Sequence, residues 1–261
     1  MPEIIVCFKE VVDERELKIN PQTQGLVTEG IARKISDFDL NAIEEAVRIK
    51  EKHDGKAIGL IMGPPDCKAS IKKALSMGLD SACLLSDPVF IGSDTLTTAS
   101  ILAAATRRLG SFDLILCGEA STDSFSAQLG SSLAEWLKIP SITAVSQLDV
   151  QDGKLVAERN VEEGIEVVEV SFPALITVTK EINKPRLATL KQIMRAAKKE
   201  LIEWKAADIN LSPDQVGPES SWVELRQLMA FKMERKGIFL EGTPKEAAEK
   251  AIRELAKEGV L

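Results

Sequence analysis

Short apolar runs alternate with longer stretches of helical period along the first 150 residues of the chain. The strand-sized runs are Ile4–Phe8, Lys56–Met62, Ala82–Leu85, Phe112–Cys117 and Ile142–Leu148. The helical patterns between them cover Phe38–Lys52, Asp66–Met77, Thr95–Leu109 and Ser126–Leu137. Strands that alternate with helices predict an open, mostly parallel α/β sheet of Rossmann-like type, covered on both faces.

The first predicted helix has a clear entry signal. Its apolar stripe follows the helical period, with Phe38, Ala42, Ile43, Ala46, Val47 and Ile49 on one side. Ser36 and Asp39 have the spacing of a capping box in its acidic form, which predicts that the helix begins just after Ser36.

The pattern changes after about Val150. Lys154–Arg159 and Ile165–Phe172 predict the two arms of a hairpin around the turn Glu162–Gly164. Pro173–Val178 then predicts a buried strand. A polar, basic loop follows at Asn183–Lys199, and we expect it to end in a short helix.

The last quarter of the chain predicts an arm. Residues 206–221 carry Asn, Ser, Pro and Gly without a clear period and are typical of a linker. Helices are expected at Trp222–Met233 and at Thr243–Glu258, the second with Thr243 as N-cap and Pro244 as first residue. We therefore divide the chain into an α/β domain, residues 1–205, and a linker with a C-terminal arm, residues 206–261. Such an arm either packs on a partner chain or folds back onto the body.

Composition and charge exclude several classes of protein. The 261 residues include 44% hydrophobic and 28% charged ones, as in a globular protein, and the net charge of −7 gives no basic field for nucleic acid. The longest apolar runs are far below the about 20 residues that cross a bilayer. No signal for secretion stands at Met1–Val6, so a cytoplasmic protein without membrane insertion is expected.

Cysteine and histidine usage argues against a catalytic or metal centre. The four cysteines, Cys7, Cys67, Cys83 and Cys117, form no C-x-x-C pair and are expected to be buried and reduced. The single histidine, His53, stands where the first helix should end, and its expected role is at that helix C-terminus. We expect no metal site and no catalytic residue, so that any chemistry comes from a bound cofactor.

The segment Cys117–Ser132 follows a predicted strand and runs into a helix. It is rich in hydroxyl and small side chains, so its backbone N–H groups and the following helix N-terminus suit a phosphate. The alternative is a helix cap, because Ser, Thr and Asp prefer such positions in any protein. Neither G-x-x-x-x-G-K-[ST] nor a G-x-G-x-x-G after Ile4–Phe8 is present, so the ligand is not expected to be a transferable phosphoryl group.

The loop Asn183–Lys199 combines apolar and basic side chains. Leu187, Leu190, Ile193 and Met194 are framed by lysines and arginines, a combination that suits docking to another protein. The alternative is an amphipathic helix packed on its own sheet.

Taken together, these segments resemble the electron transfer flavoprotein beta subunit family over nearly the whole chain. Arg159–Glu166 followed by Phe172–Val178 is similar to that family's signature stretch. Asn183–Leu190 is similar to its partner-recognition loop, and Gly118–Gly130 to its nucleotide loop, with Asp123, Gln128 and Gly130 in the matching places. Phe38–Arg48 and Gly63-Pro64 add further matches.

The resemblance implies a fold like the adenine nucleotide alpha hydrolases and a subunit of a heterodimeric electron carrier, not an enzyme by itself. It implies that this subunit holds AMP or a second FAD, that a redox FAD held mainly by the alpha subunit approaches near Phe38, and that the C-terminal helices wrap the alpha subunit. The implied cofactor-binding residues are Cys7, Lys9, Ser36, Asp37, Phe38, Asp39, Met62, Gly118, Glu119, Ala120, Ser121, Thr122, Asp123, Ser124, Phe125, Ser126, Ala127, Gln128, Leu129 and Gly130.

The same resemblance implies docking to acyl-CoA-type or other flavin dehydrogenases, with a quinone oxidoreductase as a further candidate. Leu190 would be the anchor side chain, and the implied docking residues are Arg186, Leu187, Leu190, Ile193, Met194 and Arg195. An electron-bifurcating activity of the complex is compatible with a second FAD.

The sequence departs from the family pattern at three places. Asn160 stands where an acidic residue often follows the arginine, Glu14 lies near a position where some members have an aromatic residue, and Arg195 replaces a modifiable lysine. Two other functions remain open. A nucleotide hydrolase or ligase would need an S-G-G-x-D-S loop after the first strand, and Cys7–Asp13 lacks it; a stress-type nucleotide sensor would not need the hairpin region or the arm.

Overall fold

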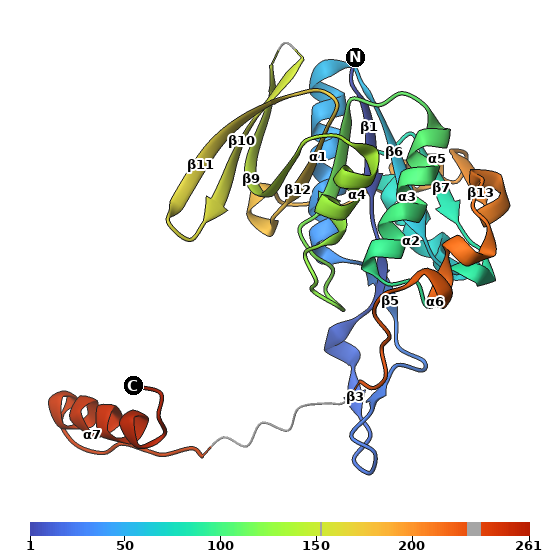
Figure 1. Cartoon of the computed structure of the whole chain (residues 1–261). Helices are drawn as coiled ribbons and strands as arrows, with labels where there is room; N and C mark the ends of the chain where they lie inside the picture. Colours follow the sequence, from blue (N-terminus) through green and yellow to red (C-terminus); the bar gives the residue numbers. More distant parts are fainter. Residues whose placement is uncertain (152, 229–235) are drawn as a thin grey trace.

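The computed structural model describes residues 1–151, 153–228 and 236–261, and a nine-stranded sheet forms its centre (Figure 1). The strand order is β11-β10-β9-β12-β8-β1-β6-β7-β13. The bounds are β1 (Glu3–Cys7), β6 (Lys56–Met62), β7 (Ser81–Leu85), β8 (Leu114–Gly118), β9 (Ser141–Gln151), β10 (Lys154–Val161), β11 (Gly164–Ser171), β12 (Ala174–Val178) and β13 (Glu200–Trp204). All neighbouring pairs are parallel except β9 with β10 and β10 with β11. The predicted α/β class with a mostly parallel sheet is confirmed.

Strand β1 lies in the middle of the sheet and marks the change of winding direction. From β1 the chain proceeds to β6 and β7 on one side, and then returns to β8 on the other side. Two loops therefore diverge at the carboxyl ends of β1 and β8. In open parallel sheets such a switch point leaves a crevice for ligands.

Helices cover both faces of the sheet. Helices α1 (Asp37–His53) and α2 (Lys68–Met77) pack on one face, and α3 (Thr95–Leu109) and α4 (Leu129–Leu137) pack on the other (Figure 1). Alternate residues of β1 serve the two layers, since Ile4 and Val6 belong to the core under α1 while Ile5 and Cys7 belong to the core under α3. This alternation follows from the two-residue period of a strand.

Most predicted elements are present within a few residues of their expected bounds. The helix predicted at Thr95–Leu109 and the strand at Lys56–Met62 are confirmed with those limits. The predicted hairpin is formed by β10 and β11, with Glu162 and Glu163 in the turn. The short helix expected in the basic loop is α5 (Leu190–Ala196).

Several short strands escaped the sequence pattern. Strand β13 extends the sheet edge beside β7, and two small ribbons pair β2 (Glu10–Val12) with β5 (Arg33–Ile35) and β3 (Lys18–Ile19) with β4 (Leu26–Val27). These ribbons project below the body in Figure 1. Helix α4 also begins three residues later than predicted, because residues 126–128 belong to the loop.

The C-terminal quarter differs from its prediction in two ways. Residues 206–221 form short 3-10 turns and the one-turn α6 (Gly217–Ser220), and Ala206, Ile209 and Val216 are buried against the body. The helix predicted at Trp222–Met233 is wrong for residues 222–228, which are not helical; residues 229–233 lie outside the described residues. Helix α7 (Pro244–Lys257) is confirmed, with Thr243 as N-cap and Glu246 completing a capping box.

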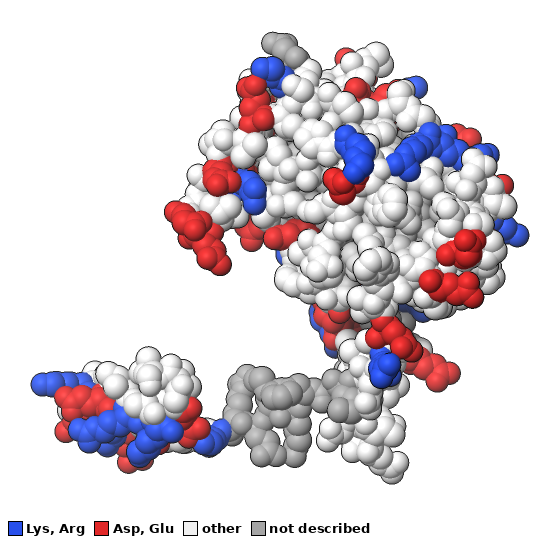
Figure 2. Space-filling view, in the orientation of Figure 1, with Lys and Arg blue, Asp and Glu red and all other residues white. Residues whose placement is uncertain are grey.

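The surface charge on one face, the apolarity of the helices and the positions of the cysteines and the histidine bear on the sequence-based expectations. On the face shown in Figure 2, Lys and Arg are interspersed with Asp and Glu, and the described residues form no continuous basic surface there. Among the helices of the described ranges, none combines the length and apolarity needed to cross a bilayer. All four cysteines are buried and free, as predicted, and His53 is the last residue of α1.

Candidate functional site

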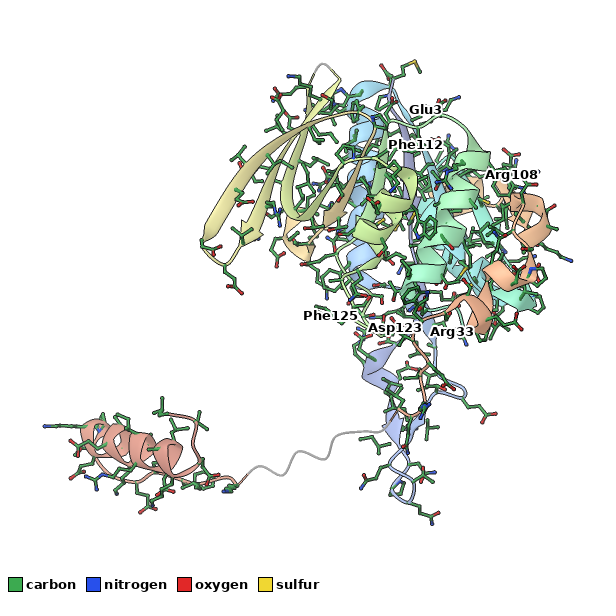
Figure 3. All side chains as sticks on the ribbon, viewed as in Figure 1. Glu3, Arg33, Arg108, Phe112, Asp123 and Phe125 are labelled. Carbon is green, nitrogen blue, oxygen red and sulfur yellow. The ribbon has the colours of Figure 1, made fainter. Side chains whose placement is uncertain are left out.

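A cavity of about 340 Å³ opens at the switch point of the sheet. That volume lies in the usual range of ligand pockets, about 300–1,000 Å³. The cavity is lined by the ends of β1, β6 and β8, the start of α1, the loop before α4, and the first half of α3 with the two residues before it. The lining residues are Cys7, Phe8, Lys9, Asp39, Met62, Ser93, Asp94, Thr95, Thr98, Leu102, Cys117, Gly118, Glu119, Ala120, Ser121, Ser124, Ser126, Ala127, Gln128 and Leu129. In Figure 3 the loop residues Asp123 and Phe125 lie at the end of the body opposite Glu3 and Phe112.

Asp39 ties the two diverging strands together in the floor of this cavity. Its carboxylate accepts the backbone N–H of Lys9 (2.8 Å), just beyond β1, and that of Gly118 (3.2 Å), the last residue of β8. The side chain is almost completely buried. Burial raises the pKa of Asp39 to about 7, although both N–H donors oppose that shift.

The predicted capping box at the start of α1 is therefore wrong. Ser36 is the N-cap residue by position, but its side chain makes no capping hydrogen bond. Its hydroxyl instead accepts the N–H of Thr122 (3.3 Å), and Asp39 serves Lys9 and Gly118. Contacts with distant segments replace the local bonds, and they bring α1 against the loop after β8.

The loop after β8 is closed by its own polar side chains. Asp123 accepts hydrogen bonds from the Ser121 hydroxyl (2.6 Å) and the Ser124 N–H (2.8 Å). Lys9 reaches across from the end of β1 and pairs with Asp123 at 2.6 Å. Burial opposes ionisation, yet this lysine holds the pKa of the Asp123 carboxyl below its usual value. Lys9 therefore brings a positive charge next to the loop after β8.

Backbone conformation makes the loop suitable for an anion. Phe125 (φ 48°) and Ala127 (φ 52°) are both left-handed, a conformation that bulky residues avoid and that functional loops often impose. Gln128 is the N-cap residue of α4, and its side chain makes no capping hydrogen bond to the first N–H groups of that helix. Free N–H groups and the helix dipole favour negative charge at that end.

An aromatic pair is formed by two residues whose sequence neighbours, Asp39, Ser124 and Ser126, line the cavity. The rings of Phe38 and Phe125 meet edge to face at 5.6 Å, and Phe125 remains exposed. The ammonium group of Lys180 lies 4.6 Å above the Phe38 ring. Such a surface can receive a further planar ring.

Two thiols form part of the opposite wall. Cys7 and Cys117 are register partners on the parallel strands β1 and β8, and both are buried. The hydrogen bond with Cys7 and burial together raise the pKa of the Cys117 thiol. A thiol held protonated is a poor nucleophile, so this wall supplies shape and polarisability.

One group of possible metal ligands lies elsewhere. Glu10, Asp66 and Cys67 offer ligand atoms within 4.8 Å of one another in the described part of the chain. Glu10 already accepts a hydrogen bond from the Ser70 hydroxyl, and burial, with the nearby Glu10 carboxylate, raises the pKa of Cys67 to about 12. A protonated thiol does not ligate a metal, and we assign no metal to this group.

The basic loop Asn183–Lys199, here called the docking loop, presents apolar side chains to solvent. Leu187 is 94% exposed and Leu190 is 74% exposed; Ile193 and Met194 are exposed as well. Only Ala196 of α5 is buried. The exposed set does not pack on the sheet, which favours the docking interpretation over the alternative of an amphipathic helix packed on its own sheet.

Comparison with known proteins identifies the family. Residues 23–209 match the electron transfer flavoprotein domain. The electron transfer flavoprotein subunit beta of Thermoanaerobacterium thermosaccharolyticum is 37% identical over 259 residues, which are 99% of each chain. The chain belongs to the electron transfer flavoprotein beta-subunit family.

Two further relatives in this beta-subunit family have names of their own. The CarD subunit of the caffeyl-CoA reductase-Etf complex of Acetobacterium woodii is 37% identical over 241 residues, 92% of each chain. Protein FixA of Azotobacter vinelandii is 35% identical over 263 residues, 96% of this chain and 93% of FixA. The family resemblance found in the sequence is confirmed, and with it a role in electron transfer as part of a complex.

Most of the cofactor-binding residues predicted from the beta-subunit resemblance line this one cavity. Of those predicted, Cys7, Lys9, Asp39, Met62, Gly118, Glu119, Ala120, Ser121, Ser124, Ser126, Ala127, Gln128 and Leu129 line it. Ser36, Asp37, Phe38, Thr122, Asp123, Phe125 and Gly130 do not line it. Gly130 lies inside α4 against Thr177 of β12, and Phe38 and Phe125 pack on each other.

The sequence interpretation missed Phe8 and the side of the cavity formed by the first half of α3 with the two residues before it. Ser93, Asp94, Thr95, Thr98 and Leu102 line the cavity from this side. The signal was available, because Asp94 is a strong N-cap residue directly before the helical pattern. Its place at the cavity follows from the strand order, which the pattern alone did not give.

Proposed function

We propose that this chain is the beta subunit of a heterodimeric electron transfer flavoprotein and holds an adenine nucleotide in the cavity at the switch point. The carrying observation is the cavity itself, about 340 Å³, walled by the strand ends and by a loop with left-handed residues and the α4 N-terminus. Its volume, at the lower end of the range for ligand pockets, favours AMP over a second FAD.

The nucleotide has a physically reasonable place in this cavity. The phosphate belongs at the loop before α4, where Lys9 and backbone N–H groups offer positive charge. The adenine belongs against the apolar and thiol wall of Cys7, Met62 and Leu102. Asp39 is the unfavourable neighbour of a phosphate, because its buried carboxyl group lines the same cavity.

The redox chemistry belongs to FAD, which the alpha subunit mainly holds. Among the side chains of this chain, the Phe38–Phe125 pair under Lys180 offers a surface for the flavin edge, because planar rings pack there and the cation stabilises added negative charge. The chain itself supplies binding, orientation and exclusion of water. It is a carrier subunit and not an enzyme.

The docking loop would bind a flavin dehydrogenase of acyl-CoA type, so that electrons can pass between the dehydrogenase and the FAD of the carrier. Leu187 and Leu190 provide apolar anchors, and Lys184, Lys191 and Arg195 lie beside them in the sequence. Apolar anchors within a charged rim give a contact that forms fast and separates fast, as a shuttle requires.

Acid extraction of the purified chain, followed by chromatography of the released nucleotide, tests the proposal. We expect about one AMP per chain, and little FAD without the alpha subunit. FAD released in equal amount would favour a second FAD in this subunit and the bifurcating form. An empty cavity, and no uptake of added AMP or FAD, would refute nucleotide binding while leaving the family assignment intact.

A further inference from the structure

The docking loop is held at its first end by side chains of α1. Asn41, which is buried on α1, donates to the carbonyl oxygen of Asn183 (2.8 Å). The Asn183 side chain returns a hydrogen bond to the Asn41 carbonyl (3.0 Å) and a second to Glu45 (2.9 Å). The loop therefore leaves the body with its backbone fixed.

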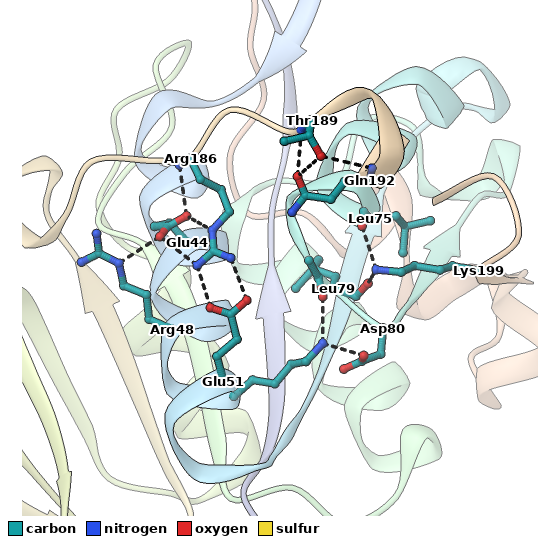
Figure 4. Close-up of polar contacts among 12 residues, drawn as sticks. Glu44, Arg48, Glu51, Leu75, Leu79, Asp80, Arg186, Thr189, Gln192 and Lys199 are labelled. Carbon is teal, nitrogen blue, oxygen red and sulfur yellow. Dashed lines mark hydrogen bonds and ion pairs between the residues drawn. The ribbon is translucent and has the colours of Figure 1, made fainter. Parts of the chain in front are cut away.

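Three residues further on, Arg186 is bound by two carboxylates of the same helix. Glu44 accepts the backbone N–H of Arg186 (3.0 Å) and its Nε (2.8 Å), and Glu51 accepts its two terminal nitrogens at 2.8 and 3.0 Å (Figure 4). The Glu44 side chain is only 4% exposed. A planar guanidinium engaged on two sides has one orientation, and its charge is neutralised within the chain.

The other end of the loop is fastened to α2. The ammonium group of Lys199 donates to the carbonyl oxygens of Leu75 (2.9 Å) and Leu79, at the C-terminal end of α2 (Figure 4). A cation at that helix end is favourable, because the last carbonyls and the dipole are negative there. Within the loop, Thr189 and Gln192 form a capping box that starts α5 at Leu190.

We propose that Glu44 and Glu51 are positioning residues for docking: through Arg186 they hold the loop so that Leu187 and Leu190 stand in solvent, ready for a partner. This inference rests on the proposed docking function and deepens it. Arg186 is then an internal fixture of the loop and not a contact for the partner. The partner-facing cations are those elsewhere in the loop, such as Lys191 and Arg195.

The physical reason is the cost of ordering a binding loop. Two leucines that already occupy their bound positions lose little conformational freedom when a partner engages them. A loop of the same composition that moves freely would pay this cost at every encounter. The carboxylates thus act on the strength of docking and leave the electron-transfer step unchanged.

The test uses the heterodimer, with an acyl-CoA dehydrogenase as electron donor. In Glu44→Gln we expect amide hydrogen exchange in residues 186–195 to rise at least roughly tenfold, with exchange in β1, β6 and β8 unchanged. The KM for the carrier should rise about tenfold, since preorganisation is lost, while kcat and nucleotide content stay the same. Glu51→Gln, at the exposed carboxylate, is the matched control and should show a smaller effect of the same kind.

A double-mutant comparison shows whether Glu44 acts through Arg186. Arg186→Met removes the side-chain contacts with Glu44 and Glu51 and keeps the backbone N–H bond to Glu44. Glu44 also keeps its bond to Arg48 (2.9 Å) in this variant, so Arg186→Met still tests the route if Glu44→Gln folds poorly. The double variant should be no worse than the worse single variant, because Glu44 then acts only through the Arg186 side chain. Additive effects would refute the route through Arg186.

The outcomes separate this inference from the docking function. Unchanged exchange in Glu44→Gln, or loosening of all of α1 with loss of nucleotide, would overturn the positioning role. If Leu190→Ala leaves the KM unchanged while Glu44→Gln still loosens the loop, the docking function fails and the positioning of the loop stands. If Leu190→Ala raises the KM but Glu44→Gln changes neither the KM nor the exchange of residues 186–195, the docking function stands and the positioning role of Glu44 fails.

Discussion

Asp39 brings a carboxyl group into a cavity that otherwise suits an anion. Buried carboxylates usually face a cation, but here the two bonds come from the backbone N–H groups of Lys9 and Gly118. The buried carboxyl group costs electrostatic free energy, but it links the ends of β1 and β8 through two hydrogen bonds. The cavity keeps its shape because both strand ends meet one side chain.

The raised pKa of Asp39 gives the first prediction. With a folded pKa of about 7 and an ordinary unfolded value near 3.8, the unfolded chain loses this proton first as pH rises. The free energy of unfolding of the wild type should therefore fall, relative to Asp39→Asn, between pH 5 and pH 7, and the difference should level off above pH 7. Urea titrations at pH 5, 6, 7 and 8 measure it; a difference that does not vary with pH would show that Asp39 is ionised throughout.

Gly118 gives the second prediction at this scale. A Cβ at this position would lie 2.5 Å from Asp39 Oδ1 and 2.9 Å from the backbone carbon of Phe38, so Gly118→Ala must displace α1 or the Asp39 side chain. We expect nucleotide affinity to fall at least roughly tenfold, measured by titration calorimetry with AMP. Gly25→Ala, whose Cβ would meet only the Thr23 hydroxyl at 3.3 Å, is the control and should bind as the wild type does. Equal affinity in both variants would mean that the nucleotide does not use this floor.

The residues of the cavity show what sequence reasoning reaches at this scale. Hydroxyl and small residues between a strand and a helix are a local signal that marks Cys117–Ser132 as a phosphate loop or a helix cap, and the family resemblance favours the nucleotide loop. Asp39 was also named, but the spacing of Ser36 and Asp39 suggested a capping box. The actual donors of Asp39, Lys9 and Gly118, lie 30 and 79 residues away in sequence, and no local pattern encodes such contacts.

At the scale of elements, α3 begins where the cavity and the start of the C-terminal arm meet. Asp94 caps α3 by accepting the N–H of Thr97 (2.8 Å), and it also accepts the N–H groups of Trp222 (2.8 Å) and Val223 (3.2 Å). The same residue lines the cavity. Burial opposes ionisation, yet these N–H donors hold the pKa of the Asp94 carboxyl below its usual value.

Asp94→Ala should loosen both elements at once. Loss of an N-cap side chain costs about 0.5–2 kcal/mol, and the two bonds to the arm add to it, so we expect the free energy of unfolding to fall by about 1–3 kcal/mol. The contribution is present above the ordinary pKa of aspartate and disappears as pH falls through the lowered one. Urea unfolding at pH 7, together with hydrogen exchange of residues 217–228, measures the effect.

Asp87→Ala is the matched control. Asp87 also caps a short helix and accepts the N–H of Ala206 (3.2 Å), where the linker begins, but it is not among the residues that line the cavity. Asp87→Ala should lower the free energy of unfolding and leave amide hydrogen exchange at Trp222 and Val223 unchanged. Faster exchange there in both variants would indicate general loosening and contradict a specific role for Asp94.

The missed elements have a common physical cause. Strand β13 has five residues, Glu200–Trp204, of which none is fully buried, so its apolar pattern is weak. It exists because β7 offers an open edge, and edge strands take their stability from the ladder more than from burial. The long buried strands and α3 carry their own signal and were predicted well.

At the scale of the whole molecule, a three-layer body carries an arm that has little core of its own. No residue of α7 is buried in the described structure, and Ile252 and Leu255 are exposed on it. With Ala248 and Ala251 they form one apolar side at helical spacing. Figure 1 shows α7 away from the sheet, at the end opposite to the N-terminus. The sequence indicates this arm through its caps and its amphipathic period, whereas no local pattern in the sequence shows what its apolar side packs on.

Removal of α7 tests whether this arm serves the assembly. A chain truncated after Gly242 should keep its nucleotide and its melting temperature, because α7 contributes no buried residue to the body. Its affinity for the alpha subunit should fall by a factor of about 10²–10⁴, since burial of two aliphatic side chains is worth about 3–5 kcal/mol. Ile252→Ser with Leu255→Ser in the full chain should reproduce the loss, because the helix remains and only its apolar side changes. A lower melting temperature of the truncated chain alone would instead show that the arm folds back on its own body, and a smaller apparent mass in gel filtration would show that α7 joins two copies of this chain.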